Sequence, residues 1–505
     1  MGSACVLSRA QVGLVAPLVR VEVHVGSGLP QFSIVGLPAP VVRESKDRVR
    51  AALASAGYDF PAGRLTVNLA PAELPKEGGR FDLPIALGIL LASDQLRPRE
   101  SLATCEFYGE LGLAGGLKRV HGVLLAALQA DAEGHRVCAP RANAVELALA
   151  GAKDRWLAAD LAEVVARVEG RMADAVAERV DETRSSATPM EPLPDIADVR
   201  GQRVAKRALL IAAAGGHHLL LSGPPGAGKS LLAQRLPGLL PPLAPAQHRE
   251  VAAIHALHSD AGAQLASARP PYRAPHHTSS AHAIVGGGPR VAPGEISLAH
   301  HGVLFLDELP EFDRRVLEAL REPLETGAVS IARAGLQATY PAEFQLVAAM
   351  NPCPAGCLPQ AGSECECKPP ERQRYLARLS GPLLDRIDMQ VRLQRVATRE
   401  WLTSAPRKGE PTSAQLAPQV AAARERQHRR QGCLNSRLRA ANTLEECRLD
   451  RAALQSLRAV SEKYRLSARA GHRLARVART IADLDGAASV TEAAIDEAAN
   501  LRLGF

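Results

Sequence analysis

The stretch that most constrains this chain is GPPGAGKS, which begins at Gly223. It follows apolar residues 219–221 and precedes 231–235, an order that predicts a strand, a glycine-rich loop and a helix. Such a loop can close its backbone N–H groups around phosphate oxygens, whereas the alternative is a chance glycine-rich turn. We expect a nucleoside triphosphate to be bound by Gly223, Pro224, Pro225, Gly226, Ala227, Gly228, Lys229 and Ser230. Lys229 would reach the β- and γ-phosphates, and Ser230 would bind Mg²⁺.

A second apolar run, residues 303–306, ends on two carboxylates, Asp307 and Glu308, and indicates a buried strand. Ligands bind at the carboxyl ends of strands in open α/β sheets, so we expect Asp307 to hold Mg²⁺ and Glu308 to polarise the attacking water. Acidic cap residues at a helix start are the alternative. A third apolar stretch, 344–350, ends on Asn351, whose amide could orient the water. These features resemble an AAA+ ATPase core, in which Asn351 would be the sensor residue.

Length and composition set outer limits on the chain. Its 505 residues are too many for one ordinary domain, and about three are expected. No apolar run of about 18 residues predicts a membrane span. The start lacks a basic segment followed by an apolar one, so we expect a cytoplasmic protein. The formal charge of +8 permits a nucleic acid as partner without requiring one.

The amino-terminal region, 1–170, is expected to be a separate domain. Alternating apolar residues and turn residues predict three strands and a hairpin, at 19–25, 32–35, 65–69 and 108–117. The region resembles the magnesium-chelatase-subunit-like domain, which shares the ribosomal S5 domain 2-like fold of the Lon protease domain. Lon uses a serine–lysine dyad, but here no serine lies between Lys76 and Ala92, and the expected helix 123–130 has no lysine. Because the dyad needs both groups, we expect a scaffold without peptidase activity.

The remaining chain completes an expected α/β multidomain protein. Residues 171–197 are rich in acids, serine and proline, which is typical of a linker. The AAA+ core is expected at 198–395 and a carboxyl-terminal helical lid at 396–505. By resemblance to AAA+ proteins, Gln202 would lie beside adenine.

Insertions in the core could carry DNA contacts. Three glycines at 286–288 suit a hairpin tip, and 328–340 is a second expected hairpin. These hairpins would present Arg290 and Arg333 at their tips, although ordinary solvated arginines are the alternative. An arginine-rich stretch, 424–439, adds to the positive charge.

Two groups of residues suggest a metal. His276 and His277 are adjacent, but neighbours on a strand face opposite sides, so we do not expect them to share an ion. Four thiolates could hold Zn²⁺ tetrahedrally, from Cys353, Cys357, Cys365 and Cys367. Their C-x3-C and C-x-C spacings are looser than common zinc pairs, and loop cysteines in a reducing cell are the alternative.

Two arginines are candidates for action between subunits. Residues 381–388 resemble the leucine-aspartate-arginine motif near the subunit interface of magnesium chelatases and replicative helicases. Arg386 would then be an arginine finger that completes a neighbour's ATP site, with a salt bridge to Asp385 or Asp388 as the alternative. Arg469 matches the second sensor arginine of these proteins, with a surface arginine as the alternative.

The three regions, in this order, resemble the ComM (YifB) family of magnesium-chelatase-like AAA+ ATPases over nearly the whole chain. The resemblance is carried by residues 35–38, 67–71, 223–230, 294–300, 306–310 and 380–388. It implies a homo-hexameric helicase that uses ATP and Mg²⁺ on single-stranded or branched DNA, promotes branch migration in natural transformation, and has no membrane partner. Composition and spacing alone indicate an ATPase with ring assembly. A chelatase-type remodeller of a protein partner would use the same ATP site and stays open.

Overall fold

The computed structural model describes residues 2–151, 154–172, 192–258, 267–288, 291–333, 336–357, 367–395 and 410–503. The chain divides into two compact units, Met1–Met190 with Pro245–Ala268, and Glu191–Ala244 with Arg269–Phe505. The ATPase core expected from the sequence, 198–395, includes residues 245–268, but these residues cluster with the first unit.

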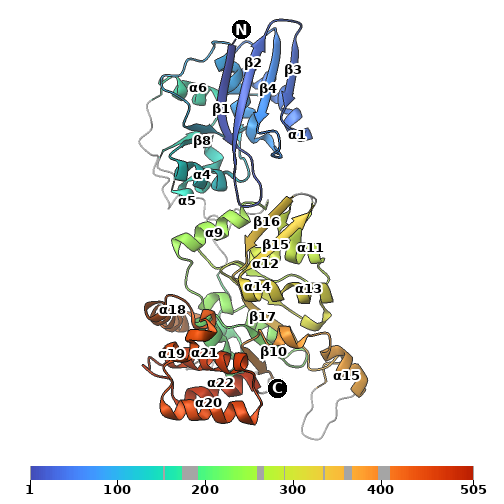
Figure 1. Cartoon of the computed structure of the whole chain (residues 1–505), viewed down its shortest axis with the longest axis vertical. Coiled ribbons are helices and arrows are strands. Elements are labelled where there is room, and N and C mark those ends of the chain that lie inside the picture. Colours follow the sequence, from blue (N-terminus) through green and yellow to red (C-terminus); the bar gives the residue numbers. More distant parts are fainter. Residues whose placement is uncertain are drawn as a thin grey trace. The chain divides into compact units, whose positions relative to one another are not determined.

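A seven-stranded mixed sheet forms the first unit, in the order β3-β4-β2-β1-β5-β8-β9 (Figure 1). Its strands are β1 Gly2–Arg9, β2 Leu18–Gly26, β3 Gln31–Val35, β4 Arg64–Ala70, β5 Cys105–Phe107, β8 Arg136–Pro140 and β9 Arg155–Ala158. Strand β2 is antiparallel to β1 and β4, and the other neighbours are parallel. Val19, Val21 and Val23 of β2 are buried while the residues between them are exposed, as the alternating sequence predicts.

The buried face of this sheet packs on helix α3, Asp82–Ala92, which contacts β1 and β2. This helix is apolar on nearly all sides because it is buried on nearly all sides. The other elements of the unit are α1 Pro40–Arg43, α2 Ser45–Ser55, hairpin strands β6 Glu110–Leu111 and β7 Leu117–Lys118, α4 Val123–Glu133, α5 Ala144–Ala150, α6 Leu161–Val168 and α9 Pro245–His255. Helix α9 contacts α4 and contributes Ala252 and Ala253 to the core cluster that contains the buried residues of α4.

A five-stranded parallel sheet forms the centre of the second unit, in the order β11-β14-β17-β10-β18. Its strands are β10 Leu219–Ser222, β11 Tyr272–Arg273, β14 Val303–Leu306, β17 Gln345–Met350 and β18 Met389–Arg392. The carboxyl ends of parallel strands meet at one edge, so the residues that follow β10, β14 and β17 are brought together there. Those residues are Gly223, Asp307 and Asn351. This α/β arrangement with a parallel sheet is the one that the sequence predicts.

Two hairpins extend from this sheet and pack together. Strands β12 Gly286–Gly287 and β13 Ala292–Pro293 form the first, and β15 Ala328–Arg333 and β16 Leu336–Pro341 the second. The Tyr340 hydroxyl donates to the Val291 carbonyl, 2.7 Å away. Neighbouring helices are α11 Ala281–Val285, α12 Glu295–Leu298, α13 Arg314–Ala319 and α14 Arg321–Thr326.

Helices make up most of residues 410–503 and lie together in Figure 1, where they are drawn in red. They are α18 Ser413–Gln431, α19 Thr443–Cys447, α20 Arg451–Lys463, α21 Ala468–Leu484 and α22 Glu492–Leu503, and α15 Pro369–Leu376 and α16 Gly381–Leu384 precede them. Helix α18 starts at a Thr412 capping box. Helices α18 and α21 pack on α7, Arg203–Gly215, and α22 packs on β18. Leu474, Val477 and Ile481 are buried, as their helical spacing predicts.

Candidate nucleotide-binding site

The glycine-rich loop links strand β10 to helix α8, Lys229–Ala233, in the predicted order. Gly226 and Gly228 have φ angles of 77° and 89°, in the left-handed region that side chains rarely adopt. Gly228 is the cap residue of α8, so the loop turns directly into the positive end of a helix. This local geometry suits the binding of phosphate oxygens by backbone N–H groups.

Lys229 connects the loop to the end of β17. Its ammonium group donates to the Gly223 carbonyl at 2.7 Å, to the Pro224 carbonyl at 2.9 Å and to Oδ1 of Asn351 at 2.9 Å. Burial lowers the pKa of Lys229, and the nearby carboxylates of Asp307 and Glu308 oppose that shift. A cation held on three neutral oxygens could exchange them for the oxygens of a charged phosphate.

The expected magnesium ligands are in direct contact. Ser230 Oγ donates to Asp307 Oδ2 across 2.5 Å, which joins the start of α8 to the end of β14. A hydroxyl and a carboxylate side by side are the hard oxygen donors that Mg²⁺ prefers, so these two residues fit the ion.

Glu308 follows with a left-handed backbone, φ 53°, and a side chain that is 52% exposed. Its Oε2 atom lies 3.1 Å from Nδ1 of His277. We missed this contact in the sequence because the adjacent strand, β11, has only two residues and produces no periodic signal.

The two histidines also correct an expectation. His276 and His277 lie in an irregular segment after β11, and not on a strand. Their ring centroids are 4.2 Å apart, so the side chains do not face opposite sides. Nδ1 of His276 is bonded to the Thr278 hydroxyl at 2.8 Å, whereas His277 reaches Glu308.

A pocket of about 480 Å³ opens beside the loop. It is lined by Asp198, Val199, Arg200, Gln202, Pro225, Gly226, Ala227, Gly228, Leu231 and Arg395. The Gln202 amide donates to the Ala227 carbonyl at 3.0 Å and to the Gln394 carbonyl at 2.6 Å. The residue expected beside adenine is therefore fixed against the loop itself, in a cavity with room for a base and a sugar.

A second pocket, of about 450 Å³, contains both arginines expected to act between subunits. Arg386 and Arg469 line it with Arg437, Arg439, Arg473 and Arg476. Arg386 forms an ion pair with Glu325, and this pairing lowers the pKa of Glu325. Among the described residues, Arg386 pairs with Glu325 and not with Asp385 or Asp388, the alternative partners expected from the sequence. None of the residues of this pocket lines the pocket beside the loop.

Three of the four clustered cysteines are described. One sulfur from each of Cys353, Cys357 and Cys367 lies within 4.8 Å of the others. The Cys357 and Cys367 sulfurs are 4.0 Å apart, and Cys357 N donates to Cys353 Sγ at 3.0 Å. Cys365 lies outside the described residues.

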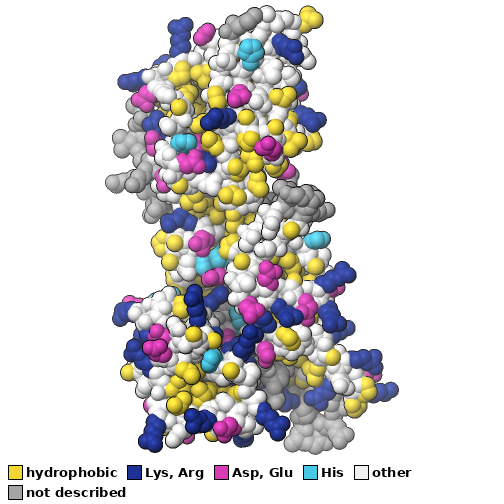
Figure 2. Space-filling model, viewed as in Figure 1, with side chains coloured by type: hydrophobic (Ala, Val, Ile, Leu, Met, Phe, Trp, Pro, Cys, Tyr) yellow, Lys and Arg dark blue, Asp and Glu magenta, His cyan; other side chains and the backbone are white. Residues whose placement is uncertain are grey.

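The expected DNA contacts are only partly within the described chain. Arg290 lies outside it, and Arg333 is the last residue of β15, with no side-chain detail. Figure 2 shows Lys and Arg side chains spread over this face and interspersed with Asp and Glu. On this face, charge alone does not mark one nucleic-acid surface.

Three of the six arginines in the stretch 424–439 bond within the second unit, so they give little support for DNA binding. Arg424 donates twice to the Ala213 carbonyl near the end of α7, and burial lowers the pKa of Arg424 to about 10. Arg426 donates to the Asp483 carbonyl, and Arg430 forms a bidentate pair with the Asp483 carboxylate. These three guanidinium groups join helices to one another and satisfy carbonyls inside the unit.

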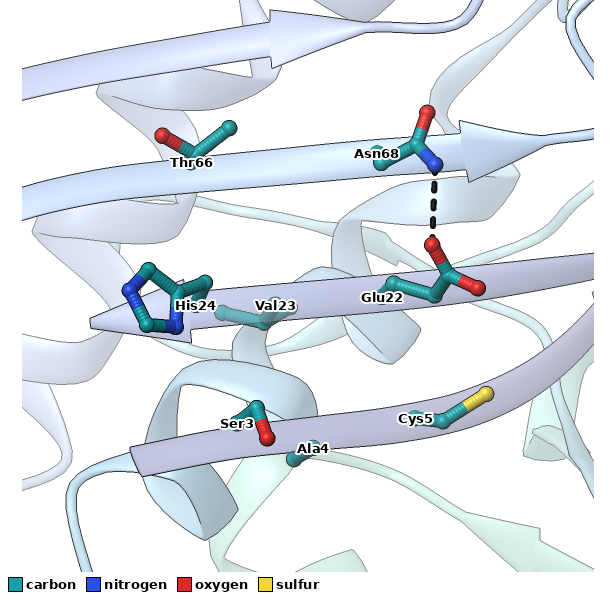
Figure 3. A pocket seen from close by; sticks show the side chains of 8 residues that line it. All are labelled: Ser3, Ala4, Cys5, Glu22, Val23, His24, Thr66 and Asn68. Atoms are coloured by element: carbon teal, nitrogen blue, oxygen red, sulfur yellow. Dashed lines mark hydrogen bonds between the residues drawn. The ribbon is translucent and has the colours of Figure 1, made fainter. Parts of the chain in front are cut away.

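A hollow on the open face of the first unit is a weak candidate for chemistry. Figure 3 shows side chains from β1, β2 and β4 around it, with Asn68 donating to Glu22 at 2.8 Å. Burial and the charge of Glu22 raise the pKa of the Cys5 thiol, which disfavours the reactive thiolate.

Among the described helices, none combines the length and apolar content needed to cross a bilayer.

The fold and this geometry define a P-loop nucleotide-binding unit. Three family descriptions match successive parts of the chain: "Subunit ChlI of Mg-chelatase" at 21–143, "Magnesium chelatase, subunit ChlI" at 195–401, and "Magnesium chelatase, subunit ChlI C-terminal" at 410–502. Competence protein ComM of Haemophilus influenzae is 46% identical over 503 residues, covering 99% of this chain and 98% of that protein. Uncharacterized protein YifB of Salmonella typhimurium is 45% identical over 502 residues, covering 99% of this chain and 97% of that protein.

The chain therefore belongs to the ComM/YifB family of magnesium-chelatase-like AAA+ ATPases. A more distant similarity, 29% over 166 residues, links it to the magnesium-chelatase 67 kDa subunit of Chlorobaculum parvum, covering 31% of this chain and 23% of that subunit. The family implies the use of ATP and Mg²⁺.

Proposed function

We propose that this protein is an ATP-driven DNA motor, a homo-hexameric helicase that promotes branch migration during recombination of incoming DNA. One observation carries the proposal: a loop, a carboxylate pair and a sensor amide meet at one sheet edge in a chain that matches a competence protein along its whole length. The cytoplasm is the expected compartment, because recombination takes place there.

The residues of the site divide the work of hydrolysis. Lys229 binds the β- and γ-phosphates once it releases the loop carbonyls, and Ser230 and Asp307 hold Mg²⁺. When bound there, Mg²⁺ would neutralise charge that develops on the phosphate oxygens. Glu308 accepts a proton from the attacking water. Asn351, already bonded to Lys229, reports the presence of the γ-phosphate to the end of β17.

The second pocket supports the proposal of ring assembly. Arg386 and Arg469 share a strongly basic cavity that has no residue in common with the pocket beside the chain's own loop. We assign them to the triphosphate bound by a neighbouring subunit, where an arginine finger stabilises the transition state. The helices of 410–503, which carry Arg469, then act as a lid over the core.

DNA contact is assigned to the hairpin pair. The bond from Tyr340 to Val291 holds the two hairpins together, and we place the DNA contact on this pair, with Arg290 and Arg333 as its proposed basic residues. Basic side chains there would neutralise backbone phosphates.

The alternative is a chelatase-type remodeller of a protein partner, favoured by the similarity to a magnesium-chelatase subunit. A DNA motor should bind forked DNA with an affinity that falls steeply as salt rises, and ATP should drive strand displacement. The K229A variant, with its phosphate contact removed, is the matched control: it should bind DNA but displace no strand. Weak DNA binding at low salt, with hydrolysis intact, would favour the remodeller.

The first unit is proposed to be a Lon-like scaffold for assembly. Its Lys76 is buried and bonded to the Pro71 carbonyl, and burial lowers the pKa of Lys76. Buried Arg80 donates to the His121 carbonyl at 2.6 Å and to Gln11 at 2.9 Å. These cations are bound within the fold, which supports a structural role for this segment.

Zinc is proposed on geometric grounds alone, because the family relationship implies only ATP and Mg²⁺. The three described sulfurs are close enough to share one ion, and we propose Cys365, which lies outside the described residues, as the fourth ligand. A structural zinc would stabilise the loop that follows Asn351.

A further inference from the structure

His277 is placed beside Glu308 by the pairing of two strands. Strands β11 and β14 are parallel, with Tyr272 opposite Val303 and Arg273 opposite Leu304. His277 and Glu308 have the same separation in sequence as these pairs, and both follow parallel strands that end at the same edge of the sheet. The result is the 3.1 Å contact between His277 Nδ1 and Glu308 Oε2.

The imidazole is itself held on two sides. Its ring lies 4.2 Å from the ring of His276 and meets Phe312 edge-on at 6.5 Å. His276 is bonded to both the hydroxyl and the backbone N–H of Thr278. A ring supported in this way can fix the direction of a hydrogen bond.

Glu308 needs such a partner. Its side chain is 52% exposed, so few packing contacts restrict its rotamers. Its backbone N–H donates to Asp307 Oδ1 at 2.9 Å, which fixes the main chain but not the carboxylate. A base that samples several directions spends little time aligned with the attacking water.

We propose that His277 is a positioning residue for ATP hydrolysis: its Nδ1–H donates to one oxygen of Glu308, so that the other oxygen faces the water. The inference rests on the proposed role of Glu308 as the base. In this role His277 acts only through the carboxylate of Glu308.

The test is steady-state ATP hydrolysis by the full-length protein. H277A should lower kcat about 10-fold, equivalent to about 1.4 kcal/mol, with KM for ATP unchanged, because only the orientation of the base is lost. H277N keeps an N–H donor near the position of Nδ1 and should recover most of the rate. H276A is the matched control: it removes one of the two supports of the ring but not the bond to Glu308, so its loss of kcat should be clearly smaller than that of H277A.

A double variant separates this inference from the proposed function. If His277 acts through Glu308, E308Q/H277A should hydrolyse ATP no more slowly than E308Q in single-turnover experiments. A wild-type rate for H277A, an H277N rate as low as that of H277A, equal losses in H276A and H277A, or an additive loss in the double variant would each overturn the positioning role. Full turnover by E308Q would instead overturn the role of Glu308.

Discussion

Mixing two inactive variants should restore ATP hydrolysis if Arg386 acts on a neighbour's nucleotide. K229A removes the ammonium that contacts Gly223, Pro224 and Asn351, so it disables the site of its own chain. R386A removes a cation from the other pocket, which has no residue in common with the nucleotide pocket of the same chain. The two lesions therefore fall on different sites.

The expected rate of the mixed rings can be worked out from the fraction of sites that stay intact. An arginine finger contributes about 10³–10⁵ to the rate, so each pure variant should be close to inactive. A site is intact when an R386A chain supplies the loop and a K229A chain supplies the finger. In rings formed at random from equal amounts, about one site in four meets this condition. Independent sites would then give about a quarter of the wild-type rate.

The assay is steady-state hydrolysis after the variants are mixed, with two different affinity tags to prove co-assembly. K229A mixed with the double variant K229A/R386A is the control, because no intact loop is present and no activity should return. A mixed ring with no more activity than the pure variants would refute action in trans. It would leave Arg386 as the local partner of Glu325.

Four further predictions follow from individual sites. E308Q should bind ATP with unchanged Kd but slow single-turnover hydrolysis about 10²–10⁴-fold; weaker binding would contradict a role limited to the water. Elemental analysis should find about one zinc per chain, lost in C357S but kept in C433S, a cysteine outside the cluster. Casein should not be cleaved by wild type or K229A, and cleavage by both would contradict the scaffold role of the first unit. Burial lowers the pKa of His218 to about 4 from 6.5, so this group stabilises the fold above pH 6.5 and loses that contribution as the pH falls toward 4. At most about 3 kcal/mol of stability is lost, because the His218 side chain is partly exposed. Urea unfolding should show a smaller loss of stability at low pH in H218Q than in wild type, and equal losses in the two proteins would contradict the assignment.

The sequence predicts the parts of the site that depend on local patterns. Strands β10, β14 and β17 are apolar runs with polar residues at their ends, so Lys229, Asp307 and Asn351 could be identified without knowing the sheet order. Their contacts required only that parallel strands end at one edge.

The parts that escaped prediction depend on contacts between distant segments. His277 follows a two-residue strand, and its contact with Glu308 depends on which strands lie side by side and not on composition. Helix α9 lies in the middle of the core sequence, yet Ala252 and Ala253 pack in the first unit. Arg386 has two acids close in sequence but pairs with Glu325 of α14. Short-range patterns contain no information on such pairings.

The fate of the arginines limits what net charge can say about the substrate. Arg424, Arg426 and Arg430 bond carbonyls or a carboxylate within the second unit, so they add to the charge of +8 without adding to a free basic surface. Arg386, Arg469 and their neighbours line one cavity, which we assign to a neighbour's triphosphate. The charge that could hold DNA is therefore smaller than the total, and the hairpins become the decisive place to test it.

R333E should weaken DNA-stimulated hydrolysis and lower the salt slope of DNA binding while the basal rate stays unchanged. R429E is the matched control, because Arg429 is an exposed arginine of α18 that pairs with Glu425. Equal losses in both variants would indicate general charge, and no loss in R333E would remove the hairpin from the DNA contact.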